Sequence, residues 1–66
     1  MESISAIAAS IRTARKDAGL TQRDLADLAE TSERTIRAIE TGTGNPSLHA
    51  VAAAANVLGL RLTATR

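Results

Sequence analysis

The chain has 66 residues, a formal net charge of +1 and no Phe, Tyr, Trp or Cys. A chain of this length forms one small domain with a thin core of Ile, Leu, Val and Ala, which a second subunit would help to stabilise. The lack of cysteine excludes disulfides and thiolate metal sites, the single His cannot form a zinc cluster alone, and no apolar run is long enough to span a bilayer.

No segment of the chain is strongly basic. Binding to nucleic acid must therefore be inferred from motif and geometry, because bulk charge offers little support for it. The N-terminal segment MESISAIAASIR has no basic leader before its apolar part, so we expect no signal peptide and a cytoplasmic protein. We expect no cofactor, no metal site and no membrane association.

The first predicted helix is amphipathic, and it ends before Gly19, which is expected to cap it with a contact from Leu20. At about 100° per residue, Arg15 falls inside the apolar stripe of this helix. A half-buried guanidinium needs a carboxylate partner, so a specific acid is expected elsewhere in the chain. The stripe itself follows the i, i+3, i+4, i+7 spacing: Ile4, Ile7, Ala8, Ile11, Ala14 and Ala18.

The second predicted helix covers residues 22–30 and is short. Thr21 is expected to be its N-cap, with Asp24 completing a capping box. Ala26 is small enough for another helix to approach closely. The other apolar positions of this helix are expected to be buried: Leu25, Leu28 and Ala29.

The third predicted helix covers residues 33–40, with Ser32 as its N-cap and Gly42 after its end. Its two isoleucines, Ile36 and Ile39, mark the side that faces the core. Only a short turn separates it from the second helix, so the two helices are a helix-turn-helix candidate.

The fourth predicted helix covers residues 46–58, with Asn45 as N-cap, Pro46 at the first helical position and Gly59 after its end. Its buried positions are expected to be Leu48, Val51, Ala55 and Leu58. His49 in its first turn is expected to be a surface residue rather than a metal ligand, because no second ligand lies at helical spacing.

The last segment, LRLTATR, alternates apolar and polar residues in the period-two pattern of a strand. Its apolar positions are Leu60, Leu62 and Ala64. A lone strand lacks hydrogen-bond partners, so we expect it to pair with the same strand of a second copy across a twofold axis. The alternative is a polar tail. The expected organisation is a helical domain at 1–59 and a dimerisation element at 60–66.

Residues 20–42, LTQRDLADLAETSERTIRAIETG, resemble the helix-turn-helix of the lambda repressor and Cro family, also called the Xre family. The resemblance lies in the T-Q opening of the second helix, the L-A pair at Leu25, the S-x-x-T-I pattern from Ser32 and the I-E-x-G pattern from Ile39. It implies an all-α, compact four-helix DNA-binding domain. Two positions depart from the pattern. Glu30 replaces the usual turn glycine, so the left-handed backbone expected there would carry a modest strain. Thr31 replaces a branched apolar residue.

The resemblance also implies roles for individual residues. Family members commonly pair an arginine near the end of the first helix with the glutamate before the closing glycine, which here are Arg15 and Glu40. The third helix enters the major groove of double-stranded DNA. Candidate base-reading residues on its outer face are Glu33, Arg34, Arg37 and Ala38. Candidate contacts to the DNA backbone are Thr21, Gln22, Ser32, Thr35, Thr41, Thr43 and Asn45. Glu33 has an alternative role, as a negative charge that complements the helix dipole.

The resemblance implies a homodimeric repressor of a palindromic operator, and the terminal strand resembles that of HipB-like antitoxins, which bind a HipA-type kinase toxin. One alternative is a stand-alone Xre or Cro-type regulator without a toxin. Another is a protein-binding module that has lost DNA binding. An enzyme is not expected, because no nucleophile, base and orienting group converge in this sequence.

Overall fold

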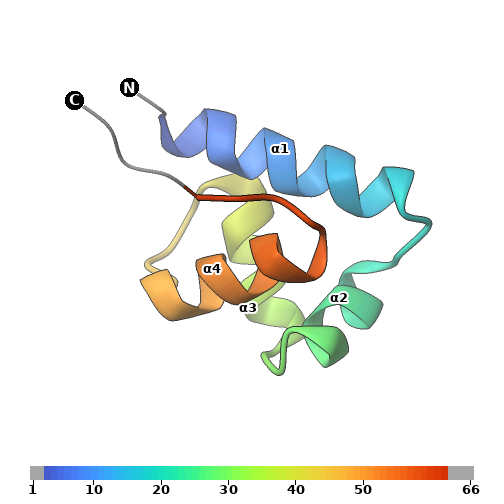
Figure 1. Cartoon of the computed structure of the whole chain (residues 1–66). Coiled ribbons are helices and arrows are strands. Elements are labelled where there is room, and N and C mark those ends of the chain that lie inside the picture. The colour runs from blue at the N-terminus through green and yellow to red at the C-terminus, as the bar shows by residue number, and fades with distance from the viewer. Residues whose placement is uncertain (1–2, 63–66) are drawn as a thin grey trace.

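Four helices joined by short turns make up the computed structural model, which describes residues 3–62 (Figure 1). They are α1 (Ile4–Asp17), α2 (Gln22–Leu28), α3 (Glu33–Thr41) and α4 (Leu48–Val57). Helix α3 packs against all three others, and α2 also contacts α4. The predicted all-α four-helix architecture is therefore confirmed. No helix within the described residues is long and apolar enough to cross a membrane.

Each helix begins at a Ser or Thr hydroxyl that accepts a hydrogen bond from the backbone N–H three residues further on. The four N-caps are Ser3, Thr21, Ser32 and Ser47, with distances of 3.1, 3.0, 3.0 and 3.0 Å. At α2 the predicted capping box is complete, since Asp24 accepts from the Thr21 N–H at 2.9 Å. These hydrogen bonds, led by the backbone N–H of Thr21, hold the pKa of Asp24 below its ordinary value.

The start of α4 differs from the sequence prediction. Ser47, rather than Asn45, is the N-cap, and Pro46 lies before the helix. The Ser47 hydroxyl accepts from the Ala50 N–H, which satisfies one of the donors that a helix start leaves free. Within a helix that began at Pro46, this hydroxyl would cap nothing.

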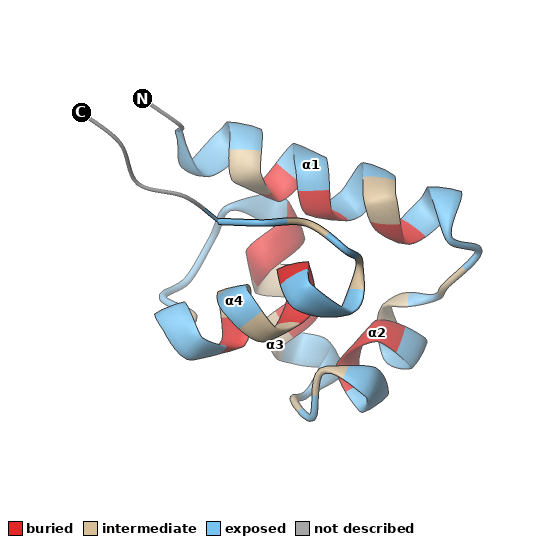
Figure 2. Ribbon diagram, in the orientation of Figure 1, coloured by how far each residue is buried: buried red, intermediate tan, exposed pale blue. Residues whose placement is uncertain are grey.

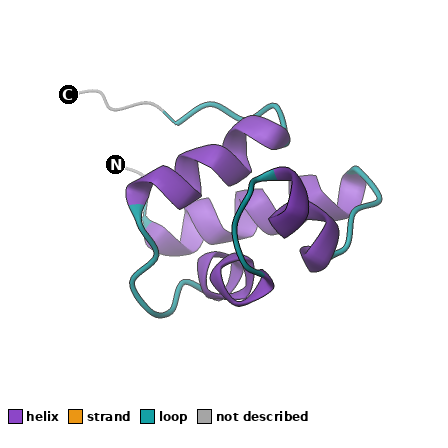
Figure 3. Ribbon diagram, turned by 90° about the horizontal axis from the view of Figure 1, so that it is seen from below, coloured by secondary structure: helices purple, strands orange, loops and turns teal. Residues whose placement is uncertain are grey.

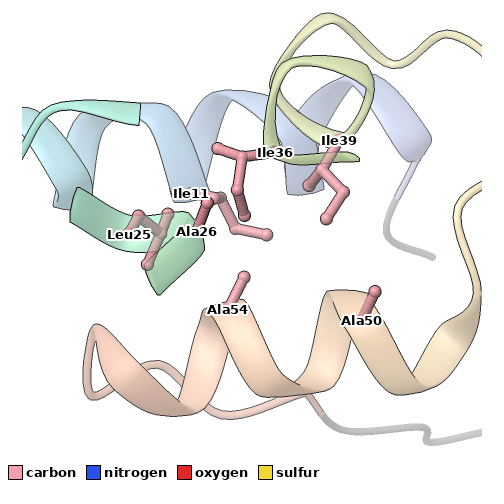
Figure 4. Packing of buried hydrophobic residues seen from close by; sticks show 7 residues of the cluster. All are labelled: Ile11, Leu25, Ala26, Ile36, Ile39, Ala50 and Ala54. Carbon is pink, nitrogen blue, oxygen red and sulfur yellow. The ribbon is translucent and has the colours of Figure 1, made fainter. Parts of the chain in front are cut away.

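The core is small and lies where all four helices meet (Figure 4). Ile11 of α1, Leu25 of α2 and Ile36 of α3 are its largest fully buried side chains. Figure 4 shows Ile36 and Ile39 pointing toward α4, where small alanines face them. Those alanines are Ala50 and Ala54. The buried residues of α4 therefore contact the core through methyl groups, and none of them contributes a large side chain.

Several apolar residues predicted to be buried are exposed or only partly covered (Figure 2). Leu28 is 58% exposed because the buried side of α2 is centred between Leu25 and Ala26, roughly 110° around the helix from Leu28. Leu48 is 79% exposed at the first position of α4. Other positions predicted to face the core are also less covered than expected: Ile4 and Ala18 are exposed, while Ala29, Val51 and Leu58 are half-buried.

Arg15 and Glu40 form the pair that the sequence predicts. Arg15 Nε donates to Glu40 Oε2 at 2.6 Å, and Nη2 donates to Oε1 at 3.0 Å, so the guanidinium and carboxylate meet along two parallel bonds. The same guanidinium donates through Nη1 to the Leu20 carbonyl at 2.8 Å. Both residues are buried. The hydrogen bonds to Glu40 raise the pKa of Arg15 above its ordinary value, against the opposing effect of burial.

The chain after α4 does not form the predicted strand within residues 60–62. Leu60 instead folds back, donating its N–H to the Ala55 carbonyl at 2.8 Å, and its side chain packs against the core. Leu60 is therefore partly buried against the core of its own chain. Leu62 is 39% exposed. Ala64 lies outside the described residues.

The turn between α2 and α3 has the left-handed backbone expected at Glu30. Its φ is +56°, and it is the one residue other than glycine with a positive φ in the part of the chain that is described. The Thr31 N–H bonds back to the Ala26 carbonyl at 2.9 Å, which closes α2 in the way that a C-terminal glycine usually does. A side chain at this φ costs about 1 to 2 kcal/mol.

We therefore expect Glu30→Gly to stabilise the protein by about 0.5 to 1 kcal/mol, because relief of the left-handed strain exceeds the entropy that glycine adds to the unfolded chain. Urea unfolding followed by circular dichroism measures the change. Gly19→Ala is the matched control. Gly19 has φ +72° and nothing within 4 Å of an added Cβ, so this variant should lose stability for conformational reasons alone. A Glu30→Gly variant that is less stable than the unaltered protein would contradict the predicted strain at Glu30.

A second prediction concerns the buried pair. Arg15→Met or Glu40→Leu alone should cost about 3 to 5 kcal/mol, because each leaves a buried charge without its partner. The double variant should lose at least about 2 kcal/mol less than the sum of the single losses. Urea unfolding of all four proteins gives the coupling. Should the single variants fail to fold, a folded double variant still demonstrates it, whereas additive losses would refute a coupled pair.

Candidate nucleic-acid interface

The outer face of α3, defined by Arg34, Arg37 and Thr41, is exposed. It lies opposite Ile36 and Ile39, which hold the helix to the core, so its direction is fixed by packing. The guanidinium of Arg34 makes no ion pair or side-chain hydrogen bond to any residue within 3–62. A planar cation on a rigid exposed helix suits bidentate contact with the edge of a guanine.

Arg37 is engaged with Glu33 one turn earlier on the same helix. Arg37 Nη2 donates to Glu33 Oε2 at 3.2 Å, and both side chains remain about half exposed. An exposed pair at this spacing contributes at most about 0.5 kcal/mol, so its main effect is to restrict where the guanidinium points. The i, i+4 spacing was visible in the sequence and could have predicted this contact. Glu33 therefore has a role in addition to the two that the sequence indicates.

Ala38, one of the candidate base-reading residues, is only half exposed. The turn after α3 covers part of it, since Thr43 N–H donates to the Ala38 carbonyl at 3.0 Å and a Cβ on Gly44 would lie 3.6 Å from the Ala38 methyl. Thr43 and Asn45 in this turn are exposed. The turn thus lies beside the C-terminal half of the outer face of α3.

The candidate hydroxyl contacts are already hydrogen-bonded within the protein. Ser32 and Thr35 share one hydrogen bond at 2.9 Å, and Thr41 and Thr43 share another at 2.7 Å. The Thr41 hydroxyl also donates to the Arg37 carbonyl at 2.8 Å. A phosphate oxygen accepts hydrogen bonds and cannot donate them. At least some of these hydroxyls must therefore give up an internal hydrogen bond and rotate in order to donate to a phosphate.

Gln22 joins α2 to the buried pair. Its side-chain amide donates to Glu40 Oε1 at 3.2 Å, so one carboxylate receives hydrogen bonds from α1 and α2 while belonging to α3. Gln22 retains a second amide hydrogen for an external acceptor. Nothing in the helical spacing of Gln22 alone indicated this contact. Thr21 is exposed beside it at the start of α2.

A family model described as Helix-turn-helix (HTH_3) matches residues 11–64. The chain belongs to the HTH_3 family. The matched residues include all of α2, α3 and α4 together with Arg15 and Glu40. No curated protein matches the chain in sequence.

HTH_3 domains of this Xre/Cro type are DNA-binding domains of transcriptional regulators and are not catalytic. Membership therefore supports the DNA-binding function that the sequence predicts. Membership also indicates which helix of the pair reads DNA, because in a helix-turn-helix the second helix, here α3, enters the major groove.

The contact between Glu33 and Arg37 leads to a prediction about sequence preference. If Glu33 acts by directing Arg37, then Glu33→Ala and Arg37→Ala should both weaken preference at the same base pair of the DNA site. If Glu33 instead accepts a hydrogen bond from cytosine N4, the two variants should weaken preference at different base pairs. Selection of bound duplexes from a random pool, performed with each variant, measures the preferences.

Loss of a negative charge near DNA should itself raise affinity for any duplex. Asp17→Ala, which removes the same charge from the exposed end of α1, is the control for this effect. A Glu33→Ala variant whose base preferences match those of the unaltered protein would exclude both roles in reading DNA.

Proposed function

We propose that this protein is a dimeric, sequence-specific repressor that reads a palindromic operator through the outer face of α3. The observation that carries the proposal is the pair of arginines, Arg34 and Arg37, exposed on a helix whose orientation is fixed by buried isoleucines and by Glu40. A module that no longer bound DNA would have no reason to keep cations on this rigid surface, which disfavours that alternative.

In the proposed complex each side chain of the outer face has a distinct task. Arg34 contacts a guanine through two hydrogen bonds, and Arg37, directed by Glu33, contacts a second base or a phosphate. Ala38 offers its partly exposed methyl group to a thymine. These contacts give sequence preference, because they reach base edges rather than the backbone.

The polar residues around α3 position the protein on the DNA backbone. Some of these residues lie at the starts of α2 and α3, and the others lie at the end of α3 and in the turn that follows it. The proposed backbone contacts are Thr21, Gln22, Ser32, Thr35, Thr41, Thr43 and Asn45. None of them is cationic, so few counterions are released by these contacts, and the affinity should depend less steeply on salt than for a strongly basic repressor.

A narrower proposal is that the protein is the antitoxin of a HipBA-like operon, binding a kinase toxin as well as DNA. The antitoxin proposal is favoured by the side of α4 that faces away from the core. This side is uncharged, and it would stay free to bind a toxin while α3 occupies the major groove of DNA. The alternative is a regulator of the same type that has no toxin. Co-expression with the product of an adjacent kinase-like gene, followed by isolation of a stoichiometric complex, would separate the two.

Arg34→Ala tests the main proposal. It should relax preference at one base pair in each half-site and cost about 1 to 3 kcal/mol of discrimination there, which corresponds to roughly a 5-fold to 150-fold loss. Selection from a random duplex pool and competition binding on the selected site measure it.

Arg12→Ala, which removes an exposed cation from α1, is the matched control and should leave the base preferences unchanged. The proposal fails if the unaltered protein selects no preferred sequence, or if Arg34→Ala and Arg12→Ala lower affinity equally for every sequence.

A further inference from the structure

The chain has an uncharged stretch that includes a whole surface helix. No Asp, Glu, Lys or Arg occurs from Thr41 to Leu60, a range that contains the turn after α3 and all of α4. Surface helices of small proteins that stay monomeric usually carry charges on their exposed side. Two uncharged surfaces result, and each is a candidate for a partner. One is the outward side of α4, where the polar His49 and Asn56 are exposed, and the other lies beside the turn after α3.

The surface beside the turn is a groove of about 280 Å³ at the N-terminal ends of α1 and α4. Two of its walls carry the most exposed large apolar residues of the described chain, Ile4 at 71% and Leu48 at 79%. Ile4 leans over the end of α3, because its Cγ2 lies 3.4 Å from where a Cβ on Gly42 would be. Further apolar lining comes from Ile7, Ile39, Pro46 and Val51. The groove therefore has projecting apolar side chains next to a hollow, as a self-complementary surface needs.

The outward side of α4 cannot serve as the interface of a dimer that reads a palindrome. Ile36 and Ile39 of α3 point toward α4, so the outer face of α3 is directed away from it (Figure 4). Figure 3 shows α3 end-on at one side of the molecule and α4 at the other. Two copies joined through the outward side of α4 would direct their α3 helices in opposite directions, and both could not enter one duplex.

The groove meets the requirement that the outward side of α4 fails. It lies at the flank of the molecule, against the C-terminal end of α3, and its lining includes Ala38, Gly42 and Thr43. If the twofold axis passes beside the groove and runs parallel to the direction in which the outer face of α3 points, the outer faces of both copies stay on the same side of the dimer. The turn between them carries no charge, so the close approach of two identical surfaces meets no like-charge repulsion.

We propose that a second copy of this chain docks at the groove, with Ile4 and Leu48 of each copy packed against the other across a twofold axis. This inference rests on the proposed function, because it is the need to place two α3 helices on one duplex that selects the groove. It assigns the dimer contact to the helical domain, where the sequence had indicated the terminal segment.

The arrangement fixes the polarity of each half-site. With the groove at the dyad, the C-terminal end of α3 lies near the centre of the operator and its N-terminal end lies away from it. Arg34 therefore reads a base pair farther from the centre than the base pair that Arg37 reads, and Thr43 contacts the backbone near the centre.

Leu48→Glu tests the interface. The side chain is 79% exposed, so the substitution leaves the core intact, but it places two like charges against each other in the dimer. We expect the dimer dissociation constant, measured by sedimentation equilibrium, to rise at least about thirtyfold. Ile4→Glu should have the same effect. The matched control is Leu28→Glu, an exposed leucine on α2 outside the groove, which should leave the dimer unchanged.

DNA binding separates failure of this inference from failure of the proposed function. On the palindrome selected by the unaltered protein, Leu48→Glu should bind at least about tenfold more weakly than Leu28→Glu, which adds the same charge, whereas on a duplex with one half-site these two variants should bind equally. The groove is refuted if the unaltered protein is a monomer on its palindrome, if Leu48→Glu stays dimeric, or if Leu28→Glu is the variant that dissociates. Lack of sequence preference in the unaltered protein refutes the proposed function itself.

Discussion

The structure depends on one buried ion pair. Arg15 of α1 and Glu40 of α3 meet through two hydrogen bonds, and the same two groups also hold the Leu20 carbonyl before α2 and the Gln22 amide within it. In a core without aromatic rings, van der Waals contact alone leaves short helices weakly oriented relative to one another. The ion pair supplies directional bonds between α1, α2 and α3 at a single point. Since α3 is the helix proposed to contact DNA, these bonds orient its outer face as well as stabilise the fold.

The outer face is more constrained than a row of exposed side chains suggests. Glu33 holds Arg37, and the hydroxyls of Thr41 and Thr43 are bonded to each other or to the helix backbone. Of the charged candidate base-reading residues, only Arg34 makes no ion pair with another side chain within residues 3–62. Contacts that form before DNA arrives reduce the entropy lost on binding, but each also competes with the DNA for the same donor. Discrimination should therefore depend most on Arg34, with Arg37 adding to it through its fixed direction.

Some features of the structure could be predicted from the sequence, and others could not. Local chemistry was read correctly where a residue has few alternatives: Thr21 and Ser32 cap their helices, and Glu30 adopts the left-handed turn. The burial of Leu28 and Leu48 was predicted wrongly, because periodicity gives the spacing of an apolar face and not its centre, which depends on how closely the alanines of a neighbouring helix approach. The strand was wrong within residues 60–62 because Leu60 has a better site against its own core. The candidate site followed from the family resemblance, whereas its internal hydrogen bonds required the structure.

The errors at Leu48 and Ile4 carry functional information. An amphipathic pattern places both residues on a buried face, and a single chain does not bury either of them. A small domain with few large apolar residues gains nothing from exposing two of them to water, since burying such a side chain contributes about 1.5 to 3 kcal/mol. Both residues line the same groove, and both flank the turn at the end of α3. An apolar residue that the pattern predicts to be buried, but that a single copy leaves exposed, is expected where a second copy would cover it. In the proposed dimer, the surface that stabilises the thin core of each copy would also set the spacing of the two half-sites.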